Sequence, residues 1–129
     1  MPDCRAPVAV FDSGLGGISV LRELVRTLPR ENYLYFGDSL HAPYGTKTPQ
    51  EVITLSLQAA DRLLAQGAKA LVVACNTATS AAIRTLRKTY PELAIVGTEP
   101  AIKPAVERHP GGRILMLATA MTVQEEKFQ

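Results

Sequence analysis

The stretch PVAVFDSGLGG (Pro7–Gly17) passes from a short apolar run into a glycine-rich turn. The run Pro7–Phe11 is apolar without alternation, which is typical of a strand covered on both faces of a parallel sheet. Four further runs have the same character: Tyr33–Phe36, Ala70–Ala74, Ala94–Val96 and Ile114–Ala118. The sequence therefore predicts five parallel strands, of which the first ends at the glycine-rich turn.

Helical patterns fill the gaps between these runs. The four predicted helices extend from Ile18 to Leu28, from Thr48 to Gly67, from about Thr77 to Tyr90, and from near Pro100 to His109. The second begins with a capping-box pattern, Thr48 to Glu51, with Pro49 at its first position. Strands alternating with helices predict an α/β fold: a doubly wound, mostly parallel sheet with flanking helices, of flavodoxin-like type.

The end of the chain has a helix-start pattern of its own. Thr122 and Glu125 form a second capping-box pattern, and the sequence stops about two turns later. We expect residues 1–98 to form an N-terminal α/β domain and residues 99–129 to begin a second α/β domain that is truncated.

The composition argues against several classes of partner and site. A net charge of +2 with scattered basic residues does not favour nucleic acid, and no apolar run is long enough for a membrane span. Two cysteines and two histidines make a disulfide framework or a metal site unexpected. A reducing cytoplasm is the expected compartment.

Polar residues follow three of the predicted strands, where ligands of open parallel sheets bind. After the first strand come Asp12, Ser13 and a glycine turn that favours an anion or merely allows close packing. The dinucleotide fingerprint would need glycine at Ser19, although Asp38 lies at a ribose-binding spacing. A nucleotide site is therefore only weakly indicated.

The second strand is followed by the long loop Gly37–Pro49, which holds Asp38, Ser39, His41, Tyr44 and Thr46. Loops at this edge commonly carry function, but His41 alone is explained as a solvated side chain. We expect Tyr44 to face the same crevice as Asp12 and Ser13.

Cys75 follows the third strand and precedes the third helix, which Asn76 or Thr77 is expected to cap. A helix N-terminus favours a thiolate, whereas apolar burial favours an inert thiol. A partly exposed Cys75 would act as a nucleophile, a base or an oxidisable thiol. If the first three strands are neighbours, Cys75, Asn76 and Thr77 join the same crevice.

The motifs DSGLGG, APYG and CNTAT, in this order and spacing, resemble those of glutamate racemases in the aspartate/glutamate racemase superfamily. The resemblance implies an enzyme that interconverts L- and D-glutamate for peptidoglycan synthesis without a cofactor or a metal. Its substrate would be a small molecule, glutamate. In this family two cysteines transfer protons on opposite faces of the α-carbon.

The resemblance also implies roles for individual residues. Cys75 would be the proton-transfer group that faces the α-proton of the D-enantiomer, and Asp12 would assist it. The matching substrate-binding positions are Ser13, Pro43, Tyr44, Gly45, Asn76 and Thr77, with Thr119 and Thr122 in a further segment lining the site.

The family's second cysteine lies in a Gly-Cys-Thr-His motif that this sequence does not contain. Cys4 precedes the first strand and cannot replace it, so we expect the chain alone to lack racemase turnover. Two alternatives stay open: another racemase of the superfamily, such as an aspartate-type enzyme, or a non-catalytic anion- or nucleotide-binding module. Apolar surface left by a missing half would favour a homodimer or other self-association.

Overall fold

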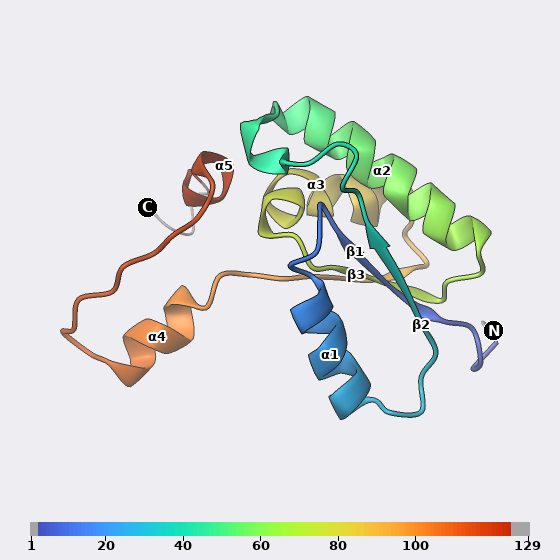
Figure 1. The fold of residues 1–129 in the computed structure, drawn as a ribbon, viewed down its shortest axis with the longest axis horizontal. Coiled ribbons are helices and arrows are strands. Elements are labelled where there is room, and N and C mark those ends of the chain that lie inside the picture. The colour runs from blue at the N-terminus through green and yellow to red at the C-terminus, as the bar shows by residue number, and fades with distance from the viewer. Residues whose placement is uncertain (1–2, 125–129) are drawn as a thin grey trace.

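The computed structural model describes residues 3–124, which form a four-stranded parallel sheet with helices on both faces (Figure 1). The strands are β1 (Val8–Asp12), β2 (Tyr33–Gly37), β3 (Ala70–Val73) and β4 (Ala94–Gly97). Their order is β2-β1-β3-β4, so β1 pairs with both β2 and β3. The carboxyl ends of β1, β2 and β3 therefore meet at one edge, as the sequence predicts.

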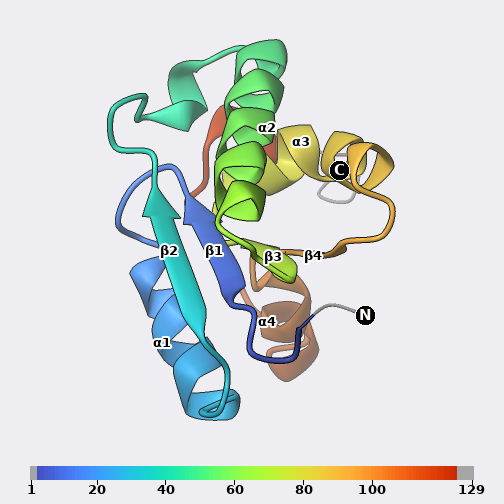
Figure 2. The same ribbon diagram turned by 90° about the vertical axis from the view of Figure 1, so that its right-hand side faces the viewer.

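The helices are α1 (Ile18–Thr27), α2 (Pro49–Ala65), α3 (Asn76–Thr89), α4 (Ile102–Arg108) and α5 (Ala120–Val123), with a short 3-10 helix η1 (Tyr44–Thr46). α2 and α3 cover one face of the sheet, and α1 lies on the other (Figure 2). This arrangement confirms the predicted doubly wound α/β fold.

The core lies between the sheet and the α2–α3 layer. Phe11 and Val73 on the strands pack with Val52 and Leu63 of α2 and Leu86 of α3, all 2% exposed or less. α1 contributes no fully buried side chain. The sheet is therefore anchored mainly through one of its two faces.

Local signals in the sequence explain the helix ends. The Thr48 side chain accepts a hydrogen bond from the Glu51 amide, and the Glu51 carboxylate accepts one from the Thr48 amide. This reciprocal pair confirms the predicted capping box. After α2, Gly67 adopts a left-handed φ of 84°, which a side chain would disfavour.

The predicted fifth strand at Ile114–Ala118 is wrong. This segment has no strand structure, pairs with none of the four strands of the described sheet, and leaves Leu115 and Leu117 86% and 89% exposed. An apolar run forms a strand only where a neighbouring strand supplies hydrogen bonds. After β4 the chain instead leaves the sheet, forms α4, and returns through this segment to α5 (Figure 1).

The last described helix also differs from the prediction. It begins at Ala120, and its cap is Thr119, whose hydroxyl accepts a hydrogen bond from the Thr122 amide. Thr122 is thus inside the helix rather than at its cap, and Glu125 lies outside the described residues. α5 packs against α3. The division of the chain after residue 98 stays a prediction.

Candidate active site

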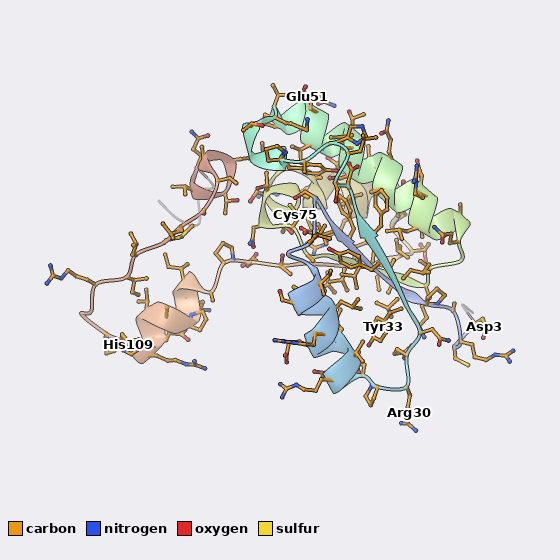
Figure 3. The ribbon with its side chains drawn as sticks, in the orientation of Figure 1. Asp3, Arg30, Tyr33, Glu51, Cys75 and His109 are labelled. Carbon is orange, nitrogen blue, oxygen red and sulfur yellow. The ribbon has the colours of Figure 1, made fainter. Side chains whose placement is uncertain are left out.

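A cavity of about 780 Å³ opens at the carboxyl ends of β1 and β3. It lies between the sheet edge and the segment that returns from α4 to α5. Six of the predicted site residues line it: Asp12, Cys75, Asn76, Thr77, Thr119 and Thr122. Figure 3 shows Cys75 at this end of the sheet and Asp3, next to Cys4, at the other.

Cys75 joins β3 to α3 and is itself the N-cap of the helix. Its Sγ accepts a hydrogen bond from the Ala78 amide at 3.4 Å, and its thiol donates to the Ser13 hydroxyl at 3.5 Å. The predicted cap at Asn76 or Thr77 is wrong, because the sulfur already satisfies the free amide of the first turn. A thiolate at this position would keep the Ala78 amide and could accept from Ser13 as well.

Asp12 holds the glycine turn against the end of β1. Its Oδ2 accepts hydrogen bonds from the Gly14 amide at 3.2 Å and the Gly17 amide at 3.0 Å, and the side chain is 7% exposed. A Cβ added at Gly17 would lie 2.7 Å from the Asp12 Cβ. The glycine therefore permits a close approach that aims the carboxylate at the start of α1.

This arrangement bears on the anion-binding interpretation of the turn. The amides that a phosphate would need at a helix N-terminus are here bound to a carboxylate of the chain itself. The glycine turn thus positions Asp12, and two of its amides already donate to that carboxylate instead of to a nucleotide phosphate.

Three threonine hydroxyls converge on one wall of the cavity. Thr77 Oγ1 lies 2.9 Å from Thr119 Oγ1, which lies 3.1 Å from Thr122 Oγ1. Thr77 and Thr122 are 5% and 1% exposed, whereas Asn76 beside them is exposed. The cluster connects α3 to α5, so residues 42 positions apart in the chain form one polar surface.

Pro43, Tyr44 and Gly45 are not among the residues that line the cavity, and their role at the substrate site stays a prediction. The Tyr44 ring is 1% exposed, packs beside Phe11, and its hydroxyl donates to Asp38 Oδ2 at 2.6 Å. Burial, and then the bond to Asp38, raise the pKa of the Tyr44 phenol. The Tyr44 ring is fixed in the core, and the charges of Cys75 and Asp12 lie near enough to raise the pKa of its phenol further.

The His41 side chain contacts Asp38 and is not simply solvated. Its Nδ1 lies 2.8 Å from Asp38 Oδ1, so both oxygens of the buried Asp38 carboxylate have a partner in this loop. The weakly indicated ribose-binding role of Asp38 has no support in this geometry, because the carboxylate points into the loop. Asp38 lines a separate hollow of about 220 Å³ beside α2.

Comparison with known proteins decides the family. Residues 9–129 match the profile of the Asp/Glu/Hydantoin racemase family. The chain belongs to this family. A glutamate racemase of Clostridium perfringens is 55% identical over 125 residues, which is 97% of this chain and 48% of that protein.

Solved structures of the family share this fold. Escherichia coli glutamate racemase, in complex with L-glutamate and the activator UDP-MurNAc-Ala, is 34% identical with a TM-score of 0.86, over 95% of this chain and 47% of that one. The Thermus thermophilus enzyme in complex with β-chloro-D-alanine is 46% identical with a TM-score of 0.71, over 86% and 42%. The chain spans about half the length of these relatives.

The cavity is also lined by residues that were not predicted to belong to the site. Thr98, Glu99 and Pro100 follow β4 and line the cavity. Their place at the carboxyl end of a parallel strand is the sequence signal that points to them. The Thr98 hydroxyl donates to the Val73 carbonyl at 3.1 Å, which draws this loop toward Cys75.

Residues 3–124 contain neither a candidate membrane span nor a candidate metal cluster. None of the helices there combines the length and apolar character needed to cross a bilayer. Within the same range, no cluster of three or more His, Cys, Asp or Glu side chains could hold a metal ion.

Proposed function

We propose that this chain provides one side of a glutamate racemase active site, with Cys75 as a proton-transfer group. The observation that carries the proposal is the Cys75 sulfur at the cavity, between the Ala78 amide and the Ser13 hydroxyl. Family membership supports it, as do the relatives described as glutamate racemases, one of them in complex with L-glutamate.

The proposed reaction begins with a thiolate at Cys75. The thiolate takes the α-proton of D-glutamate, so that a C–H bond breaks, an S–H bond forms, and the electron pair remains on the substrate. The Ser13 hydroxyl and the Ala78 amide stabilise the thiolate before this step. Asp12, which lines the same cavity, assists the proton transfer.

Polar groups around the cavity orient the substrate. The exposed Asn76 amide and the hydroxyls of the cluster Thr77, Thr119 and Thr122 suit the amino and carboxylate groups of glutamate. The N-terminus of α3 favours an anionic group at the same place. Gly45 contributes through its backbone, which lies against Thr119.

Inversion needs a second proton-transfer group on the opposite face of the α-carbon. The other cysteine of the 129-residue sequence is Cys4, which is exposed and precedes β1. Its neighbour in the sequence, Asp3, lies at the end of the sheet opposite Cys75 (Figure 3). We therefore propose that this chain by itself moves the proton of one enantiomer and does not invert it.

Two further proposals rest on the family resemblance, and a third rests on exposed apolar side chains. The whole enzyme would act in the cytoplasm and supply D-glutamate for peptidoglycan synthesis. Exposed apolar side chains near the cavity, including Leu115 and Leu117, would favour a homodimer or other self-association.

Calorimetry tests the substrate assignment. We expect the chain to bind glutamate more tightly than aspartate, and to bind NAD or ATP at no measurable level. Tight nucleotide binding without glutamate binding would contradict the proposal, and tighter aspartate binding would favour an aspartate-type enzyme. In parallel, circular dichroism of either glutamate enantiomer is expected to stay constant. Racemisation that Cys75→Ser abolishes would show that a second cysteine is not required.

A further inference from the structure

The Asp38 carboxylate is buried at the end of β2 but lies outside the proposed substrate site. It is 7% exposed, accepts a hydrogen bond from the Tyr44 hydroxyl at 2.6 Å, and lies 2.8 Å from His41 Nδ1. It does not line the main cavity. A role in direct contact with the substrate therefore does not fit Asp38, and its effect must pass through its neighbours.

Tyr44 is the neighbour through which it can act. The ring is fixed in the core beside Phe11, with 6.1 Å between ring centroids, and its hydroxyl is held by Asp38. Burial and the bond to Asp38 raise the pKa of this phenol, so it stays a neutral donor at neutral pH. The first residue of η1 is thus fixed at both the ring and the hydroxyl.

The next residue, Gly45, connects Tyr44 to the cavity wall through a contact with Thr119. A Cβ added at Gly45 would lie 2.6 Å from Thr119 Cγ2, so the backbone of η1 is in tight contact with Thr119. The Thr119 hydroxyl in turn lies 2.9 Å from that of Thr77. Contacts therefore run without a gap from Asp38 through Tyr44 and Gly45 to the threonine cluster.

We propose that Asp38 is a positioning residue that, through Tyr44, presses the η1 backbone against Thr119 and so fixes the hydroxyl cluster of the substrate site. His41 completes the carboxylate's hydrogen bonds and holds it toward Tyr44. The inference rests on the proposed function for its consequence on glutamate binding. Its consequence for the geometry of the cluster is independent of the substrate.

Three variants and one matched control test the inference. Asp38→Ala removes the acceptor, Asp38→Asn retains an oxygen that can accept from Tyr44, and Tyr44→Phe removes only the hydroxyl while keeping the ring. Tyr90→Phe is the control, because the Tyr90 hydroxyl also donates to a carboxylate, that of Asp61. Tyr90 lies at the far end of α3, about 20 Å from Cys75 at 1.5 Å per residue.

Two measurements on the full chain are compared. The first is NMR of ¹³C-methyl threonine without substrate, and the second is the glutamate dissociation constant by calorimetry. We expect Asp38→Ala and Tyr44→Phe to shift the Thr77 and Thr119 methyl signals and to weaken glutamate binding about tenfold. Asp38→Asn should give threonine methyl signals and a glutamate dissociation constant closer to wild type than those of Asp38→Ala. Tyr90→Phe should change neither the signals nor the dissociation constant.

Unchanged threonine signals in Tyr44→Phe would overturn the inference, as would an Asp38→Asn variant no better than Asp38→Ala. If Asp38→Ala does not fold, Tyr44→Phe still decides, because it keeps the packed ring. Failure of the wild-type chain to bind glutamate would refute the proposed function instead, and the methyl spectra would still decide the positioning role.

Discussion

Replacing Gly17 by alanine tests how the glycine turn holds Asp12. The new Cβ would lie 2.7 Å from the Asp12 Cβ and 3.1 Å from the Ala74 Cβ, and neither atom can move without its backbone. Gly14 in the same turn is the matched control, since a Cβ there meets nothing within 4 Å. Neither glycine has a positive φ, so the comparison isolates the steric effect.

The expected cost follows from overpacking. Forcing a methyl group into a packed site destabilises the folded state by about 1–3 kcal/mol. A Gly→Ala change in open space stabilises the protein by up to about 1 kcal/mol, because it lowers the conformational entropy of the unfolded chain. An unfolding entropy of about 2.1 cal/mol/K per residue over 129 residues converts 1 kcal/mol to about 4 °C. Gly17→Ala should therefore lower the melting temperature by about 4–11 °C, and Gly14→Ala should not lower it.

Thermal unfolding followed by far-UV circular dichroism measures both variants. Because the Gly17 amide donates to Asp12, we also expect Gly17→Ala to weaken glutamate binding. Equal melting temperatures for the two variants would refute the close approach that the structure describes.

Three further predictions follow from single contacts. Hydrogen bonds from the Thr48 amide and hydroxyl lower the pKa of Glu51 below 4.5. Glu51→Gln should therefore lower the melting temperature at neutral pH, and the difference between the variant and the wild type should fade as the pH falls through the lowered pKa. Burial, and then the bond to Asp61, raise the pKa of Tyr90 to about 12, so the chain should lose stability between pH 10 and 12, and Tyr90→Phe should lose less. Thr77→Val removes a hydroxyl bonded to Thr119 and should cost about 0.5–1.5 kcal/mol in urea unfolding.

The sheet could be predicted because its signals are local. β1 and β3 are continuous apolar runs, and the Thr48–Glu51 pair and Gly67 mark helix ends by rules that need no tertiary contact. Ile114–Ala118 has the same apolar character, but a strand there depends on a neighbouring strand. Composition alone cannot supply that information.

The candidate site also has parts that the local sequence predicts and parts that depend on tertiary contacts. Asp12 and Cys75 were predicted from their places at strand ends, and the motif resemblance added Thr119 and Thr122. The burial of Tyr44 could not be predicted, because it depends on Asp38 and Phe11 meeting the ring in three dimensions. The capping role of Cys75 was missed because sulfur is an uncommon cap.

The most direct test of the central claim is exchange of the glutamate α-proton in D₂O, followed by ¹H NMR. With Cys75 as the proton-transfer group at the cavity, the chain should exchange the α-proton of D-glutamate with retention of configuration. It should leave L-glutamate unexchanged, and Cys75→Ser should abolish the exchange. Exchange that persists in Cys75→Ser, or that occurs with L-glutamate alone, would contradict the role assigned to Cys75.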